Sequence, residues 1–141
     1  MEFDATGVKA AKVRVIRDEN ALSKTILDAA FRVHSAVGPG LLEKAYEACL
    51  AYELRRAGLD VKTQVALPLL YKELRIDIAY RLDLLVNDLV VIELKSVDAL
   101  AAIHQAQLIS YLKLSRKKLG LLINFNVVHL RDGIKRVVNN L

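Results

Sequence analysis

Residues 83–95, Asp83-Leu-Leu-Val-Asn-Asp-Leu-Val-Val-Ile-Glu93-Leu-Lys95, predict an antiparallel β-hairpin, because two runs rich in Leu, Val and Ile flank a polar break. Side chains alternate between the faces of a strand, so Glu93 and Lys95 share one face. A two-residue turn would mix polar and apolar side chains on both faces. A three-residue turn centred on Asp88 instead places Asp83 opposite Glu93 and separates the faces cleanly. We therefore expect the three-residue turn, or a bulge nearby.

This register would gather two carboxylates and a lysine on one patch. At about 4 Å and an effective dielectric of roughly 20, two like charges repel by on the order of 4 kcal/mol, so something must offset the pair. A divalent cation does so well, because Mg²⁺ takes one or two carboxylates together with waters and phosphate oxygens. Lys95 could then orient or help deprotonate a water. The alternative is an ordinary surface patch in which Lys95 pairs with an acid.

Length and composition indicate one domain with a substantial core. The chain has 141 residues, of which 54% are hydrophobic. Its single cysteine, Cys49, excludes an intramolecular disulfide and fits a reducing compartment. The sequence shows neither a secretory signal nor a membrane-spanning run, so we expect a cytoplasmic protein with no membrane partner. The net charge of +5 permits an anionic partner such as nucleic acid without requiring one.

The first half of the chain predicts a basic arm and two helices. Residues 1–20 are interpreted as a flexible, solvated N-terminal arm, followed by a single domain over residues 21–141. A helix capped by Ser23 should end at Gly38-Pro39-Gly40, and a second should run from Leu41 to Ala57. Glu43 lies in the first turn of this second helix, where favourable interaction with the helix dipole is a sufficient structural reason for an acid.

The middle of the chain predicts a meander of three strands at residues 62–70, 74–86 and 89–97. Pro68 cannot donate a ladder hydrogen bond, so the first strand should lie at a sheet edge or contain a bulge. We then expect a helix from Ala99 to Lys117, capped by Asp98.

One face of that helix would carry Leu100, Ile103, Gln107, Tyr111 and Leu114. Buried polar groups need partners, so Gln107 and Tyr111 should face a polar pocket or each other. A buried strand at 120–125 should follow, and then a hairpin over Val127 to Val138 that turns at Asp132-Gly133.

The order of these elements, with its acids and lysine, resembles that of the PD-(D/E)XK nuclease superfamily. Within it, Gly40-Leu-Leu-Glu43-Lys-Ala-Tyr46 matches the signature of the GxxExxY proteins. Further segments agree with that group, in the order Val33-His34 before Gly38-Pro-Gly40, Tyr80-Arg-Leu-Asp83, Glu93-Leu-Lys95-Ser96 and Gln107-Leu-Ile-Ser-Tyr111-Leu112. The resemblance covers residue 21 to the C-terminus.

The resemblance implies a role for each matching residue. Asp83 and Glu93 would bind metal and Lys95 would be the catalytic lysine. Glu43 would be a supporting acid and metal ligand, direct or through water, which replaces its purely structural interpretation. Gln107 and Tyr111 match a Gln-x-x-x-Tyr element that supports the catalytic site and the DNA strand in related nucleases. Tyr46 would likewise bind nucleic acid or support the site. Where the superfamily usually has proline before the first aspartate, this chain has Leu82.

We therefore expect an α/β fold with a restriction-endonuclease-like core: a helix, a three-strand antiparallel meander, a helix and a strand in a mixed central sheet flanked by helices. An extra N-terminal helix and a C-terminal hairpin would complete it. The expected activity is divalent-metal-dependent hydrolysis of phosphodiester bonds in DNA or RNA by a metal-activated water, with one or two Mg²⁺ or Mn²⁺ ions.

Two alternatives to an independently active nuclease stay open. One is a catalytically silent, nuclease-like module that binds nucleic acid or serves as an adaptor. The other is a subunit whose site works only within a larger assembly, and for that case a homodimer is favoured.

Overall fold

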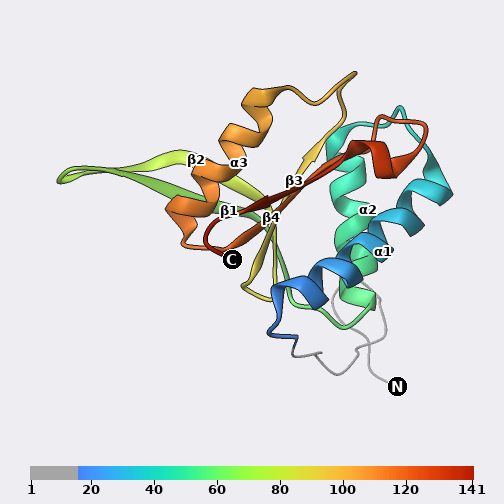
Figure 1. The fold of residues 1–141 in the computed structure, drawn as a ribbon, viewed down its shortest axis with the longest axis horizontal. Coiled ribbons are helices and arrows are strands. Elements are labelled where there is room, and N and C mark those ends of the chain that lie inside the picture. The colour runs from blue at the N-terminus through green and yellow to red at the C-terminus, as the bar shows by residue number, and fades with distance from the viewer. Residues whose placement is uncertain (1–15) are drawn as a thin grey trace.

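The chain folds around one mixed β-sheet with helices on both faces (Figure 1). The structure, a computed structural model, describes residues 16–141, without the side chains of residues 78 and 79. Its elements in chain order are α1 (Glu19–Val37), α2 (Glu43–Arg56), β1 (Val61–Tyr71), β2 (Leu74–Val86), β3 (Val90–Lys95), α3 (Ala102–Ser115), β4 (Leu119–Asn124), a 3₁₀ turn (Leu130–Gly133) and β5 (Ile134–Val138).

The five strands follow the order β1-β2-β3-β4-β5. Neighbouring strands are antiparallel, except that β3 and β4 are parallel and are connected through α3. A parallel pair needs such a crossover connection, usually a helix, whereas antiparallel neighbours can be joined by short turns. The expected α/β class is confirmed, including its mixed sheet, its N-terminal helix and its C-terminal hairpin.

Two hydrophobic clusters hold the helices on the sheet. On one face, α1 and α2 bury residues such as Leu22 and Leu50 against Ile92 of β3. On the other face, Leu108 and Leu112 of α3 pack against a separate cluster of strand residues. Since each fully buried Leu or Ile contributes about 1.5–3 kcal/mol, these contacts fix the central strands firmly on both faces. The sheet is therefore a rigid support for any side chains that leave it.

The β2–β3 hairpin has the expected register. Leu84 pairs with Ile92 and Val86 pairs with Val90, which leaves a turn of three residues centred on Asp88. Asp88 and the residue before it, Asn87, have φ values of 56° and 51°. Asn and Asp tolerate this left-handed region better than most residues do. The prediction of a three-residue turn is confirmed.

The β1–β2 hairpin extends beyond the rest of the molecule as an arm (Figure 1). Near its end, Leu70, Tyr71 and Leu74 are exposed to solvent. β1 is an edge strand, and its pairing with β2 shifts register between Leu67 and Leu69, on either side of Pro68. The expected edge position and the expected bulge are both present.

The N-terminal boundaries differ from those expected. α1 begins at Glu19, and its N-cap is Asp18, whose Oδ1 accepts the Asn20 N–H at 2.9 Å. The predicted cap, Ser23, is wrong, because this residue is buried inside the helix. Of the arm expected at residues 1–20, residues 1–15 lie outside the described part of the chain. α2 begins at Glu43, two residues later than expected.

The boundary and buried face of α3 were also wrongly predicted. The helix begins at Ala102 rather than Ala99, and His104 Nδ1, not Asp98, accepts the Ala101 N–H at 3.0 Å. Its buried residues are Leu108 and Leu112, whereas Ile103 is 62% exposed and Gln107 is also exposed. The face with the expected apolar pattern is therefore exposed at Ile103 and Gln107 and only half-buried at Leu100, Tyr111 and Leu114.

The C-terminal hairpin consists of β4 and β5, joined by a loop and the 3₁₀ turn. Leu119 pairs with Val138 and Ile123 pairs with Ile134. The prediction of a hairpin with a strand from Val127 and a turn at Asp132-Gly133 is wrong, because residues 125–129 form no strand, Asp132 and Gly133 lie in the 3₁₀ turn, and the partner of β5 is β4. The 3₁₀ turn ends at Gly133, where an added Cβ would lie 2.2 Å from the Asn124 carbonyl oxygen. Only glycine fits this close approach.

Candidate active site

Asp83 and Glu93 meet where the β2–β3 ladder ends. The Asp83 N–H donates to Glu93 Oε1 at 3.2 Å, and the Leu94 N–H donates to Asp83 Oδ2 at 2.8 Å. Each acid therefore accepts a backbone hydrogen bond from the opposite strand, just beyond the last paired residues, Leu84 and Ile92. The expected juxtaposition of these two acids is confirmed.

Burial makes this acid pair costly to ionise. Glu93 is only 8% exposed, and its burial, followed by the charge of Asp83, raises its pKa to about 8. The Asp83 N–H and the charge of Lys95 act in the opposite direction. The pKa of Asp83 is also raised, chiefly by burial, although the Leu94 N–H opposes the shift. A cation beside the pair would relieve this cost.

Glu43 joins the site from the N-terminus of α2. Its Oε1 accepts the Ser96 N–H at 3.3 Å, and Ser96 Oγ donates to the Leu41 carbonyl oxygen at 2.6 Å. Because Ser96 directly follows Lys95, these bonds connect the start of α2 to the end of β3. The charge of Glu43 contributes to the raised pKa of Asp83, but less than the charge of Glu47 does.

Glu47 and Gln64 belong to the site but were not predicted. Gln64 Nε2 donates to Glu47 Oε1 at 2.5 Å and to Asp83 Oδ1 at 3.4 Å, so it bridges α2 and β2. Glu47 follows Glu43 by four residues, and the helical repeat could have placed both acids on one side of α2. Gln64 gave no comparable signal in the sequence, and its φ of 51° departs from regular strand geometry.

Tyr46 supports the loop that leads into α2. It is fully buried and stacks on Phe125, with ring centroids 4.5 Å apart. Its hydroxyl donates to the Gly38 carbonyl oxygen at 2.6 Å and accepts the Leu41 N–H at 3.1 Å. The full burial of the side chain argues against direct nucleic-acid binding, the first of its two expected roles. Support of the site stays a prediction.

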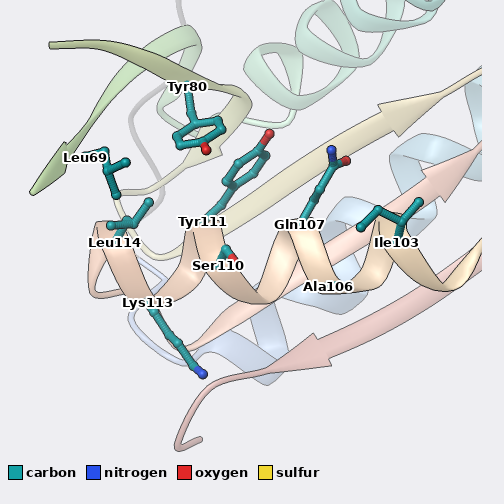
Figure 2. A pocket seen from close by; sticks show the side chains of 9 residues that line it. All are labelled: Leu69, Tyr80, Ile103, Ala106, Gln107, Ser110, Tyr111, Lys113 and Leu114. Carbon is teal, nitrogen blue, oxygen red and sulfur yellow. The ribbon is translucent and has the colours of Figure 1, made fainter. Parts of the chain in front are cut away.

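Gln107 and Tyr111 extend from the same side of α3, and Tyr80 of β2 lies beside Tyr111 (Figure 2). The two tyrosine ring centroids are 5.4 Å apart, at an interplanar angle of 47°. The pKa of Tyr111 is raised first by burial and then by the charge of Glu93, with smaller contributions from Tyr80 and Asp83. Tyr111 therefore lies close to the acid pair. Gln107 and Tyr111 line an open pocket whose walls are mostly apolar, so the polar pocket expected around them is wrong.

The acid pair fits a hard divalent cation. Within residues 16–141 no group of three or more His, Cys, Asp or Glu side chains could hold a metal ion, so Asp83 and Glu93 stand as a pair. Two carboxylates suffice for Mg²⁺, which keeps several waters. Glu43, bonded to Ser96, stays a predicted ligand, directly or through water. Lys95 is close enough for its charge to favour ionised Glu93.

Comparison with known proteins agrees with this geometry. The family profile of the PD-(D/E)XK nuclease superfamily matches residues 20–137. The chain belongs to this superfamily. Asp83 and Glu93-Leu94-Lys95, within the matched range, are the residues predicted to supply the D and (D/E)XK of the superfamily name. No curated protein and no solved structure gave a significant match.

Over the described residues, no helix combines the length and apolar character needed to cross a membrane.

Proposed function

We propose that this chain is a nuclease that depends on Mg²⁺ or Mn²⁺ and hydrolyses phosphodiester bonds in nucleic acid, with DNA as the favoured substrate. The observation that carries the proposal is the buried pair of acids, in which the pKa of Glu93 is raised to about 8 by burial and by the Asp83 charge. Such a pair is unfavourable without a cation and is well suited to binding one. The superfamily supplies the reaction class.

Each residue of the site has a distinct task in this proposal. Asp83 and Glu93 would hold one or two ions, and a bound ion would supply an activated water and offset the charge that develops on the phosphate. The rigid β2–β3 hairpin orients both carboxylates, with their backbone hydrogen bonds fixing the rotamers. Lys95 would position the attacking water and stabilise negative charge at the reacting phosphate. Gln107 would orient Lys95 or a phosphate oxygen.

We further propose that the chain is a GxxExxY protein, because the three residues of that signature have connected structural roles. Gly40 has a φ of 96°, a conformation that favours glycine. Tyr46 holds the loop on both sides of Gly40, through Gly38 and Leu41. The loop leads to Glu43, which bonds to the residue after Lys95. The signature thus connects the start of α2 to the predicted catalytic lysine.

The nuclease proposal can be tested by cleavage assays on single- and double-stranded DNA and RNA with Mg²⁺ or Mn²⁺. Lys95→Ala should reduce the cleavage rate by about 10²–10⁴-fold, as expected when a group acting in the transition state is removed. Lys135→Ala is the matched control, because this exposed lysine lies on edge strand β5, and it should cut like the wild type. Equal cutting by wild type and Lys95→Ala would remove the proposed mechanism.

The same assays address the silent binding module. Salt-dependent nucleic-acid binding without cleavage, unchanged by Asp83→Asn, would support that alternative and contradict hydrolysis. The homodimer stays a prediction, which the mass measured by size-exclusion chromatography with light scattering can test.

A further inference from the structure

A pocket with a volume of about 460 Å³ opens between the base of the β1–β2 arm and α3. Leu69 and Tyr80 line it from the strands, and Ile103, Tyr111 and Leu114 line it from α3 (Figure 2). Both tyrosines are accessible from this pocket, and Tyr80 is 42% exposed. The walls are therefore mostly apolar and partly aromatic.

Two polar side chains complete the lining. Gln107 offers an amide with two donors and an acceptor, and Ser110 offers a hydroxyl. Gln107 points to the same side of α3 as Tyr111, whereas the ammonium group of Lys113 points away from the tyrosines (Figure 2). The pocket thus combines an apolar, aromatic surface with a few neutral hydrogen-bonding groups, a combination that suits a flat heterocycle better than a phosphate.

Two lining residues relate the pocket to the acid pair, although Asp83 and Glu93 do not line it themselves. Tyr80 lies three residues before Asp83 on β2. From the opposite wall, Tyr111 is close enough to Glu93 and Asp83 for their charges to affect its ionisation. A ligand that fills the pocket would therefore have its neighbouring groups beside the predicted metal site.

We propose that this pocket receives an unpaired nucleobase of the substrate strand, so that the chain acts on single-stranded nucleic acid or on strand ends whose bases have separated. This inference rests on the proposed nuclease function, because it identifies the class of substrate that the same site takes. Aromatic side chains stack on any base, and each stacked base contributes about 1–3 kcal/mol. A base in an intact duplex is already stacked and paired, and cannot enter.

The tyrosine geometry indicates how the base would bind. A base held between two rings needs about 7 Å between their planes, twice the optimal carbon–carbon contact distance. The Tyr80 and Tyr111 centroids are only 5.4 Å apart, so no base fits between them. The base would instead stack on the open side of the tyrosine pair, against the apolar side chains of α3, with its edge towards Gln107. The net charge of +5 favours association with the strand as a whole.

The proposal can be tested by fluorescence anisotropy with labelled DNA of one length in EDTA, where binding is measured without metal-dependent cleavage. The wild type should bind the single strand more tightly than the duplex. Tyr80→Ala should weaken single-strand binding about 5- to 150-fold, the equivalent of losing one stacked base. Tyr80→Phe keeps the ring and should keep the affinity. Tyr52→Ala is the matched control, because Tyr52 is 44% exposed but lies on α2, and it should bind like the wild type.

An oligonucleotide in which every nucleotide is abasic separates base stacking from phosphate contacts. It should bind the wild type more weakly than the normal strand does, and Tyr80→Ala should bind it no more weakly than the wild type. Equal affinity for single strand and duplex, or a Tyr80→Ala variant that still binds the single strand like the wild type, would overturn the proposal. So would a wild-type dimer that Tyr80→Ala converts to a monomer, since the pocket would then hold a second copy.

The outcomes for the two proposals are distinguishable. Failure of the wild type to cleave any substrate with Mg²⁺ or Mn²⁺, with the Tyr80-dependent strand preference intact, would overturn hydrolysis but support the base pocket. Cleavage that requires Lys95, but proceeds equally on intact duplex and single strand and is unaffected by Tyr80→Ala, would do the reverse.

Discussion

Replacing Glu93 by Gln should stabilise the metal-free protein above neutral pH while abolishing its metal response. The pKa of Glu93 is raised from 4.5 to about 8, so the folded protein favours the protonated carboxyl. At roughly 1.4 kcal/mol per pKa unit, ionising Glu93 costs the folded state on the order of 5 kcal/mol. The protonated Glu93 carboxyl therefore contributes stability that is fully present below pH 4.5 and is lost as the pH rises through 8. Gln cannot ionise, and its amide can still accept the Asp83 N–H.

The assay is thermal and urea unfolding followed by circular dichroism between pH 5 and pH 9 in EDTA. The wild type should lose on the order of 4 kcal/mol of unfolding free energy by pH 8, a fall in melting temperature of roughly 10–20 °C. Glu93→Gln should lose much less, so its melting temperature should exceed that of the wild type at pH 8. Glu73→Gln, a change in the exposed turn of the β1–β2 arm, should keep the wild-type slope.

Mg²⁺ or Mn²⁺ supplies the second half of the test. A cation bound by the acid pair stabilises the ionised form, so adding it at pH 8 should restore most of the lost stability in the wild type and little in Glu93→Gln. Wild-type stability that stays flat or rises between pH 5 and pH 9 in EDTA would refute the electrostatic reasoning. Equal stabilisation of both proteins by the cation would refute the assignment of Glu93 as a ligand.

Three further substitutions test the parts that surround the acids. Gly133→Ala should cost several kcal/mol in urea unfolding, because its Cβ would lie 2.2 Å from the Asn124 carbonyl oxygen. Asn124→Ala should cost about 2–4 kcal/mol in the same assay, since the buried Asn124 amide bonds both the N–H and the carbonyl of Val97. Tyr46→Phe should cost about 1–3 kcal/mol, because it leaves the Gly38 carbonyl and the Leu41 N–H without their partner, and it should slow cleavage more than Lys135→Ala does.

The centre of the fold could be predicted because local signals agreed there with packing. The polar break at Asn87-Asp88 and the alternation of acids with apolar residues admitted one register that separated the faces, and the structure has that register. Pro68 placed β1 at the sheet edge for an equally local reason, the missing N–H. The superfamily resemblance then pointed to Asp83, Glu93 and Lys95, whose roles the proposed assays test.

The errors arose where tertiary contacts override local pattern. Ile103 continues an apolar stripe along α3 but is exposed, and the fully buried residues of the helix are Leu108 and Leu112. The stripe instead lines an open pocket. The prediction of a strand from Val127 was wrong because residues 125–129 form a loop, and β5 finds its partner in β4. Gln64 was missed because its position depends on three elements that meet only in the folded chain.

The three-residue turn at Asn87–Leu89 constrains how relatives of this chain can vary in length. If the turn keeps three residues, inserting or deleting a single residue there would shift the β2–β3 register by one and move one acid to the opposite face, whereas a change of two would keep both on the same side. The far end of the β1–β2 arm is under no such constraint, since its length does not set the pairing of Asp83 with Glu93. Among active homologues, indels should therefore be frequent at the tip of the arm and rare at Asp88.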